Sequence, residues 1–292
     1  MKFAFIRQYS DQFSVGLLCN TLQVSRSGYY AWRDRPVTKM QGRRKQLLEA
    51  IRQTHQKSRA IYGAPRIHRA LRAQGHQCSE NTVAKLMRQN GIRSKIQRRF
   101  RIRTTDSKHQ HPVAKNELDR QFQHERPNKA WAADITYVAT DEGWLYLAAI
   151  IDLCSRKVVG WAAADHLRTE LVCDALRMAI THRNPQPGLL HHSDRGVQYA
   201  GADYQELLAQ YAIRPSMSNV ADCYDNAVME SFFATLKREC VYHEHYSTRY
   251  QARQDLFEYI EVFYNRTRLH STLGYRSPDE FEQKPRNRQK RG

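Results

Sequence analysis

The chain of 292 residues lacks a long apolar stretch and lacks paired cysteines. Its longest apolar run extends from Leu145 to Ile151, far short of the roughly 20 residues that a membrane helix needs. The first residues also lack the apolar stretch of a secretory signal peptide. The six cysteines are scattered without a CxxC pair, which is typical of reduced thiols and argues against a disulfide framework or a zinc finger. We therefore expect a cytoplasmic protein without a membrane partner.

Acidic residues are scarce in the first part of the chain. Residues 1–125 contain 26 Lys and Arg but only 8 Asp and Glu, a net charge of +18, whereas residues 126–292 contain 21 of each. The whole formal excess therefore lies in the first part. Such a one-sided distribution predicts a dedicated arm that binds a polyanion such as double-stranded DNA. A basic surface that serves only solubility is the less favoured alternative.

The length and the change in charge predict several domains. We expect a helix–turn–helix in residues 1–40, a second helical DNA-binding domain in 41–94, a basic linker in 95–125, a catalytic core in 126–265, and a C-terminal segment with a basic tail in 266–292.

Residues 12–34 predict the helix–turn–helix. An apolar first helix around Phe13, Leu17 and Leu18 is followed by a turn, and Ser25 is suited to begin a second helix. Arg26 and Tyr29 lie near the start of that helix, where side chains reach bases and phosphates in a major groove. An ordinary helical hairpin is the alternative.

Residues 43–94 predict further helices. Pro65 suits the first turn of one helix and Ser79 suits the start of the next. Apolar residues at helical spacing predict a small core, made of Ile67, Leu71, Val83, Leu86 and Met87. Basic residues are expected to face outward, namely Arg66, Arg69, Arg72, Lys85 and Arg88. We expect Arg66 and Arg69 to contact DNA, with a helical spacer as the alternative.

The linker carries a run of basic residues that includes Arg98, Arg99 and Arg101. Such a run fits a segment that lies along a DNA backbone and adds salt-sensitive affinity without choosing a sequence. A disordered tether is the alternative.

The second half of the chain predicts strands and helices in alternation. Three strands joined by hairpin-sized gaps are expected first, at residues 130–138, 144–152 and 157–163. A helix (169–182), a strand (188–192), a helix (202–211) and a short strand (212–216) should follow. This order describes an α/β fold with a mixed five-stranded sheet of the ribonuclease H type, preceded by all-α domains.

Three acidic residues are the candidate catalytic groups. Asp134 lies in an apolar strand, Asp194 lies where the fourth strand ends, and Glu230 lies on a helix that Asp225 or Asn226 is suited to cap. Three carboxylates brought together in this way can hold two Mg²⁺ ions, the equipment for cutting and joining phosphodiesters. Taken singly, each acid could instead be a hydrogen-bonded core residue or half of an ion pair.

Two neighbouring residues complete this prediction. Lys237 shares a helical face with Glu230 and would present a cation to a phosphate. Asp152, which ends the second predicted strand, is the rival carboxylate. We expect Asp152 to have a structural role.

Several segments together resemble the second-reading-frame transposases of bacterial insertion sequences, which belong to the DDE group of the retroviral-integrase-like superfamily. The segments are VSRSGYYAW, IYGAPRIHRAL, WAADITYV, YLAAIIDLCSRKVVGW, HHSDRGVQY, SMSNVADCYDNAVMESFFATLKRE and YNRTRLHSTLGYRSP. The interval of 35 residues between Asp194 and Glu230 is part of the likeness. The resemblance implies that Asp134, Asp194 and Glu230 are the metal ligands and that Lys237 lies near the bound DNA end. Residues at flanking motif positions are implied as supporting groups, namely His192, Tyr199, Asn219 and Asn226.

The resemblance also implies the reaction and its partners. It implies a Mg²⁺-dependent polynucleotidyl transferase that uses two ions, with Mn²⁺ as a substitute, and that cleaves and joins insertion-sequence ends. Its partners would be terminal inverted repeats, target DNA, further copies of the chain on DNA, and the product of the upstream reading frame. It would work in the bacterial cytoplasm, on the nucleoid. A non-catalytic DNA-binding regulator of transposition and a structure-specific nuclease are the alternatives.

Overall fold

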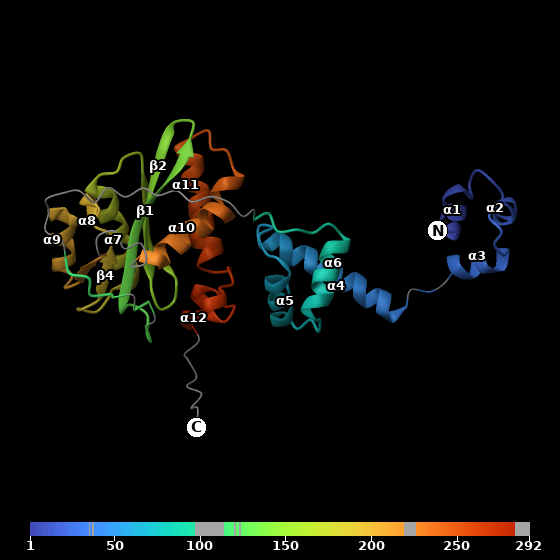
Figure 1. Cartoon of the computed structure of the whole chain (residues 1–292), viewed down its shortest axis with the longest axis horizontal. Coiled ribbons are helices and arrows are strands. Elements are labelled where there is room, and N and C mark those ends of the chain that lie inside the picture. Colours follow the sequence, from blue (N-terminus) through green and yellow to red (C-terminus); the bar gives the residue numbers. More distant parts are fainter. Residues whose placement is uncertain are drawn as a thin grey trace, which may run out of the picture. The chain divides into compact units, whose positions relative to one another are not determined.

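The computed structural model describes residues 1–34, 36, 38–96, 114–119, 121–122, 124–218 and 226–283, and it divides the chain into two compact units, residues 1–53 and residues 54–292 (Figure 1). Within these described ranges, no helix is both long and apolar enough to cross a membrane. Several residues named from the sequence lie outside the described ranges, namely Arg98, Arg99, Arg101, Asn219, Asp225 and the basic tail of residues 284–292.

The first unit contains three short helices, α1 (Lys2–Tyr9), α2 (Val15–Thr21) and α3 (Arg26–Arg33). The hydroxyl of Ser25 accepts a hydrogen bond from the Gly28 N–H, so this residue caps α3 as predicted. The three helices pack around a small core of Ile6, Leu18, Cys19 and Tyr29. The longer helix α4 (Lys39–Lys57) follows.

One helix of this unit was missed, and one expectation is wrong. The sequence did not predict α1, whose Ile6 is fully buried. Phe13 and Leu17 were expected to form an apolar helix face, but about half of each side chain is exposed. The core combines Ile6 of α1 with Leu18 and Cys19 of α2 and Tyr29 of α3.

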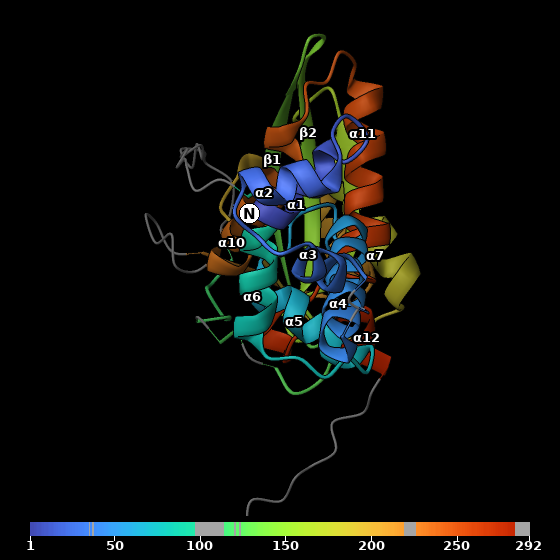
Figure 2. The ribbon, with the colours of Figure 1, turned by 90° about the vertical axis from the view of Figure 1, so that its right-hand side faces the viewer.

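The second unit begins with a helical pair, α5 (Ala64–Ala73) and α6 (Glu80–Gln89), which lie side by side (Figures 1 and 2). Pro65 lies in the first turn of α5, and the Ser79 hydroxyl caps α6 by accepting the Thr82 N–H. The predicted core residues are buried, which confirms this helical pair: Ile67, Leu71, Val83, Leu86 and Met87.

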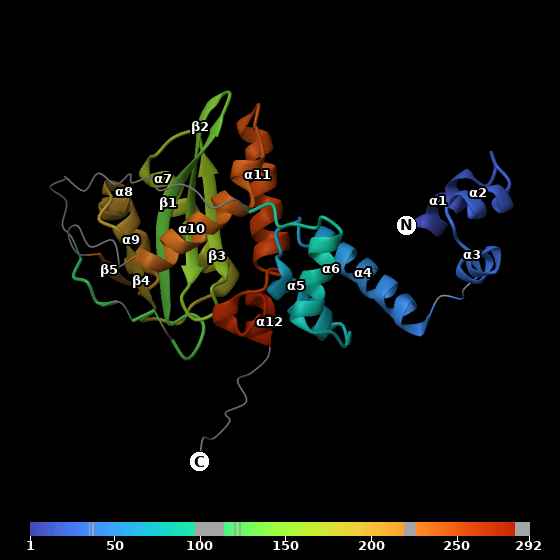
Figure 3. The same cartoon turned by 45° about the vertical axis from the view of Figure 1, so that its right-hand side comes forward.

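The sheet of the second unit has five strands in the order β3-β2-β1-β4-β5 (Figure 3). Their bounds are β1 (Ala130–Thr140), β2 (Gly143–Asp152), β3 (Val158–Ala164), β4 (Leu190–Ser193) and β5 (Arg214–Met217). The first three strands pair antiparallel, whereas β4 is parallel to both β1 and β5. The predicted mixed five-stranded sheet is therefore confirmed.

Helices cover both faces of this sheet (Figures 1 and 3). One side carries α7 (Thr169–Arg183), α8 (Val197–Ala200) and α9 (Ala202–Gln210), whose apolar residues form the main core with the sheet. The close approach of α7 depends on Gly160 in β3, because a Cβ atom there would collide with the carbonyl oxygen of Ala175. The other side carries α10 (Ala227–Glu239) and α11 (Arg249–Phe257).

The end of the second unit is irregular. Short turns flank α11: η2 (Val241–His243) precedes it, and the π-helical turn η3 (Glu258–Tyr264) extends it. The chain then forms η4 (Ser271–Leu273) and α12 (Pro278–Gln283). These turns were not predicted, since each is shorter than the periodicity that the sequence can show.

Candidate active site

The pairing of β1 with β4 sets the position of the two aspartates. Ala132 of β1 pairs in parallel with His192 of β4. Asp134 and Asp194 each lie two residues beyond this last pair, Asp134 within β1 and Asp194 directly after β4. Neighbouring strands are roughly 4.8 Å apart. The strand pairing and the effect of the Asp194 charge on Asp134 both indicate that the two aspartates lie near each other, at the carboxyl end of β4.

Asp134 is the electrostatic centre of the site. Burial raises its pKa well above the usual value, and the negative charge of Asp194 adds to that rise. Glu230 raises the pKa further, whereas the N–H of Ile135, 2.8 Å from the carboxylate, and the cation of Lys237 lower it. Three charged groups, one after β4 and two on α10, thus act on Asp134 in β1.

Asp194 is held by the turn that follows β4. Its Oδ1 accepts a hydrogen bond of 2.9 Å from the N–H of Gly196. A Cβ atom on Gly196 would lie only 2.9 Å from the same oxygen, so glycine gives the carboxylate the room it needs. The next residue, Arg195, donates from Nε to the carbonyl oxygen of Ser218 at 2.6 Å. These contacts fix the turn beside the site.

Helix α10 supplies the third acid and a cation. Glu230 is exposed, and Lys237 follows it two turns later on the same face. The Lys237 ammonium lies 4.6 Å from the centre of the Tyr137 ring of β1. Burial lowers the pKa of Lys237, and the charge of Asp134 partly offsets this effect. The end of α10 that carries Lys237 therefore contacts β1.

Asn226 does not cap α10 with its side chain, which corrects the prediction for this residue. The side chain is buried against β1, and its Nδ2 donates to the carbonyl oxygen of Ala133 at 3.3 Å. The amide oxygen is buried and has no hydrogen-bond partner among the described residues. Asn226 therefore joins the start of α10 to the strand that carries Asp134.

Tyr199 of α8 brings a hydroxyl close to the two aspartates. Burial raises its pKa well above the usual value, and Tyr204, Asp134 and Asp194 raise it further. Its hydroxyl is buried and has no hydrogen-bond partner in the described part of the chain. His192 lies deeper, with its two ring nitrogens 2.9 and 3.1 Å from the hydroxyls of Ser216 and Ser218. His192 therefore links β4 to β5.

Asp152 has a structural role, as expected. It is fully buried, and its Oδ2 accepts the N–H of Asn128 at 2.6 Å. Its Oδ1 accepts the N–H groups of Cys154 and Ser155 at 2.9 and 3.0 Å. These backbone donors occupy the carboxylate, which holds the turn between β2 and β3.

The comparisons with known proteins agree with this geometry. Models of an integrase core domain match residues 124–223 and 230–285, and a model of an HTH-like domain matches residues 43–100. Transposase InsF for insertion sequence IS3A of Escherichia coli (strain K12) is 43% identical over 97% of this chain and 99% of its own length. The chain belongs to the insertion-sequence transposases of this IS3 family. The predicted family, fold class and DNA transposase activity are thereby confirmed.

Another relative and two solved structures are also similar to this transposase. The insertion element IS600 uncharacterized 31 kDa protein of Shigella sonnei is 43% identical over 91% of this chain and 98% of its own length. A chain of the simian T-cell lymphotropic virus intasome in complex with PP2A regulatory subunit B56 gamma has a TM-score of 0.48 and 15% identity, covering 80% of this chain and 75% of that one. The HTLV-2 integrase catalytic core domain in complex with magnesium (trimeric form) has a TM-score of 0.42 and 15% identity, covering 55% of this chain and 99% of that one. Because both scores lie below 0.5, the fold assignment depends on the family models and the sheet order.

The two DNA contacts predicted for the first unit differ in exposure. Arg26 is exposed at the start of α3 and remains a predicted contact. Tyr29 is only 1% exposed, because its ring packs against Phe3 and Trp32 in the core of the first unit. The prediction that Tyr29 contacts DNA is therefore wrong.

The two arginines of α5 also differ from expectation. Arg69 is exposed, although its guanidinium lies 5.0 Å from the centre of the Tyr275 ring, and it remains a predicted contact. Arg66 was expected to face outward, but its Nη1 lies 3.5 Å from the buried carboxylate of Glu239 on α10. That charge draws Arg66 toward the catalytic core.

The described residues do not place any three His, Cys, Asp or Glu side chains where they could jointly hold a metal ion. The chemistry of the donor set nevertheless suits Mg²⁺, which prefers carboxylate oxygens. The carboxylates of Asp194, after β4, and of Glu230, on α10, both act on Asp134 in β1. An ion among them would also remove the repulsion that raises the pKa of Asp134.

Proposed function

We propose that this transposase cuts and joins DNA phosphodiesters at a site made by Asp134, Asp194 and Glu230. The observation that carries the proposal is electrostatic. The charges of Asp194 and Glu230 both raise the pKa of Asp134, although the three acids come from separate elements of the fold. Clustered carboxylates that repel one another are the usual signature of a site for divalent cations.

The proposed cofactor is Mg²⁺, two ions per site, with Mn²⁺ as a substitute. Asp134, Asp194 and Glu230 would supply the oxygen ligands. When bound, the cations activate the attacking oxygen and stabilise charge on the leaving oxygen. The Asp134 carboxyl must lose its proton before it can bind a cation, so its raised pKa opposes metal binding at low pH.

The remaining residues would orient the substrate. Lys237 presents a cation beside Asp134, where it can bind a phosphate next to the reacting bond. Asn226 fixes the start of α10 against β1, and the Tyr199 hydroxyl lies where it can donate to a carboxylate. These groups would hold the acids in place.

The proposed substrates are terminal inverted repeats and target DNA. The excess positive charge of residues 1–125 would hold the double helix and keep the transposase on the nucleoid. Two ends must be joined to one target, so we propose that further copies of the chain assemble on the DNA. The nucleophile would be water in the cutting step and a DNA 3′-hydroxyl in the joining step.

The substitution Asp194→Asn tests the site. We expect cleavage and strand transfer of terminal-repeat DNA with Mg²⁺ to fall at least about 100-fold, since losing even a group that supports a metal ligand costs roughly 10–100-fold. DNA affinity measured in EDTA should be unchanged. The exposed Asp203 on α9 offers the matched control, and Asp203→Asn should react at the parental rate. An Asp194→Asn protein that cuts and joins at the parental rate would show that the site is misassigned.

Gel electrophoresis of the reaction products distinguishes the transposase from the two alternatives, a non-catalytic regulator and a structure-specific nuclease. A non-catalytic regulator would bind the DNA without cutting it in either protein. A structure-specific nuclease would release cut products but no joined ones. Joined products that require Mg²⁺ and Asp194 support the transposase chemistry.

A further inference from the structure

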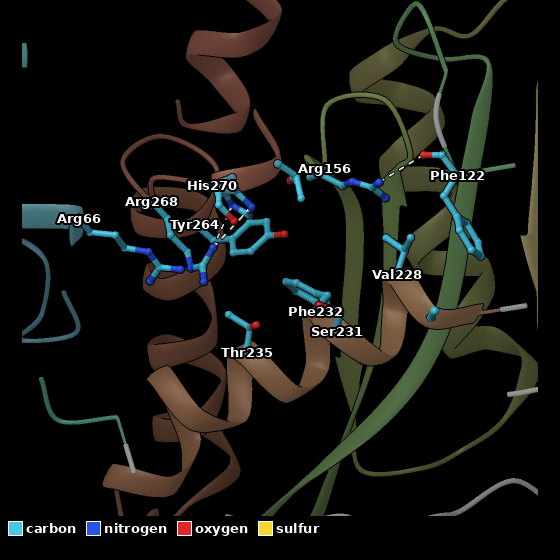
Figure 4. A pocket seen from close by; sticks show the side chains of 13 residues that line it. Arg66, Phe122, Arg156, Val228, Ser231, Phe232, Thr235, Tyr264, Arg268 and His270 are labelled. Carbon is cyan, nitrogen blue, oxygen red and sulfur yellow. Dashed lines mark hydrogen bonds between the residues drawn. The ribbon is translucent and has the colours of Figure 1, made fainter. Parts of the chain in front are cut away.

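A cavity of about 360 Å³ lies beside α10, away from the stripe that carries Glu230 and Lys237 (Figure 4). Helix α10 contributes Val228, Ser231 and Thr235 to its wall. Ser231, which lines the cavity, directly follows Glu230 in the sequence. One helix, α10, therefore carries both Glu230 and part of the cavity wall.

Three arginines from distant parts of the sequence line this cavity. Arg66 comes from α5, Arg156 from the turn between β2 and β3, and Arg268 from the segment after η3. Figure 4 shows Arg66 and Arg268 at one end and Arg156 at the other, with Tyr264 between them. A guanidinium group is costly to bury without a partner.

The carboxylates near these arginines do not use up their hydrogen-bonding capacity. Glu239 accepts from Nε and Nη2 of Arg268 at 2.7 and 2.8 Å, and Arg66 is 3.5 Å from the same carboxylate. Asp152 lies behind Arg156 but is occupied by backbone N–H groups. Neither acid lines the cavity. Three cations against two acids leave one net positive charge.

Arg156 is the least satisfied of the three. Its Nη2 donates to the carbonyl oxygen of Phe122 at 3.2 Å, but its Nη1 is buried with no acceptor in the described part of the chain. Burial lowers its pKa, which indicates that the charge is not fully compensated. A buried guanidinium N–H without an acceptor costs free energy.

The remaining walls fit an anion with several oxygens. His270 is neutral, because burial and the charges of Arg268, Arg66 and Arg156 lower its pKa to about 2. The rim carries hydroxyls on exposed residues, namely Ser231, Ser271 and Thr272. The Tyr264 hydroxyl points into the space between the arginines (Figure 4). Guanidinium forks together with hydroxyls are the groups that proteins use to bind phosphate.

We propose that this cavity binds a phosphate of the DNA strand that passes Glu230, at a position other than the bond being cut. The proposal rests on the proposed function, because it takes the substrate to be DNA held at α10. A phosphate fixed here would set how the strand lies along the helix, without reading its sequence. Free inorganic phosphate has the same chemistry and is the other source to be tested.

The first test measures DNA affinity in EDTA, over a range of salt concentrations. Each lost phosphate contact reduces the slope of log affinity against log salt by roughly 0.9. We expect Arg156→Gln to reduce the slope by about one unit and Thr272→Glu, at the exposed rim, to weaken binding. The matched controls are Arg177→Gln and Thr181→Glu, at exposed positions on α7 that do not line the cavity. If Arg156→Gln and Thr272→Glu bind like these controls, the proposal is wrong.

The second test distinguishes the two sources of phosphate. Inorganic phosphate, compared with chloride at equal ionic strength, should raise the Tm of the parent and of Arg177→Gln but not of Arg156→Gln. Arg156→Lys, which keeps the charge, should recover part of both effects. A phosphate-dependent Tm with an unchanged DNA slope would assign the cavity to the free ion and overturn the DNA contact.

The readouts need no catalysis, so they separate this proposal from the proposed function. Asp194→Asn should retain the full salt slope. A loss of slope in Arg156→Gln alongside an Asp194→Asn protein that still cuts DNA would leave the cavity standing while the catalytic site fails.

Discussion

At the scale of single residues, Asp134 shows the conflict between stability and function. The acid lies in the middle of a largely buried strand, where its charge is repelled by Asp194 and Glu230. A neutral side chain of the same shape would make the folded protein more stable. A cation bound during the reaction would remove the repulsion that makes this charge unfavourable, so the lost stability is explained by the function.

The substitution Asp134→Asn should therefore stabilise the metal-free transposase. A raised pKa in the folded state means that the carboxyl contributes its full stability below its unfolded pKa of about 3.9 and loses it as the pH rises through the folded value. At pH 7 in EDTA, Asn should raise the Tm by roughly 2–4 °C, the shift that about 1 kcal/mol produces in a domain of this size. The gain should vanish below about pH 3.9.

Thermal melts across pH check this prediction. Asp203→Asn is the control and should leave the Tm unchanged at every pH. Added Mg²⁺ should raise the Tm of the parent more than that of Asp134→Asn. An Asp134→Asn protein that melts below the parent at pH 7 in EDTA would contradict the idea that this charge is unfavourable.

Residue roles were predictable where a motif fixed the chemistry and unpredictable where packing decided. The order of Asp134, Asp194 and Glu230 along strands and helix was enough to expect them together. By contrast, Asn226 had the right position for a cap, but the nearby carbonyl of β1 attracts its amide. A sequence gives no measure of such long-range competition between hydrogen-bond partners.

At the scale of secondary structure, α10 carries three tasks on three faces. One face holds Glu230 and Lys237, another lines the cavity, and a third packs into the interior through Met229 and Leu236, both fully buried. The packing of this apolar face holds the helix in place and so positions the proposed catalytic groups.

The substitution Met229→Ala should destabilise the second unit by roughly 2–5 kcal/mol, because it leaves a void under α10. Urea denaturation would measure the loss. Ala234→Ser, on an exposed position of the same helix, should change the stability by less than about 0.5 kcal/mol. A Met229→Ala protein as stable as Ala234→Ser would mean that α10 is not held by this contact.

Most elements were predictable from apolar periodicity, and the exceptions share a cause. The five strands and the helices α7, α9 and α10 contain enough apolar residues at the right spacing to be predicted. Helix α1 and the turn η3 do not, since their conformation depends on partners elsewhere. The aromatic ring of Phe3 in α1, for example, packs on Tyr29 and Trp32 of α3.

At the scale of the second unit, one buried carboxylate connects its parts. Glu239 at the end of α10 accepts hydrogen bonds from Tyr259 and Arg268 and draws Arg66 of α5 toward it. Burial alone would raise the pKa of Glu239, but Arg268 and Tyr259 outweigh it, so the pKa is lowered. The HTH-like region and the integrase core thus share an ion network that the sequence could not reveal.

The substitution Glu239→Gln should cost roughly 3–5 kcal/mol of stability at neutral pH, because it leaves buried arginines without their anion. A lowered folded pKa gives stability that is present above the unfolded value of about 4.3 and is lost as the pH falls through the folded value. The difference between parent and Glu239→Gln should therefore shrink in acid. Glu206→Gln, on the exposed face of α9, should match the parent. Equal stability of Glu239→Gln and Glu206→Gln at pH 7 would refute the network.

The parallel pairing of β1 with β4 has a consequence for how such a chain can vary. The two aspartates are brought near each other by the pairing of β1 with β4, and the loops that join the elements between them take no part in that pairing. Insertions in the intervening loops should thus be harmless to the chemistry. A shift of β4 by one residue relative to β1, however, would move the side chain of Asp194 toward the other face of the sheet. We therefore expect loop lengths between Asp134 and Asp194 to vary among related chains, whereas the pairing of β1 with β4 should not.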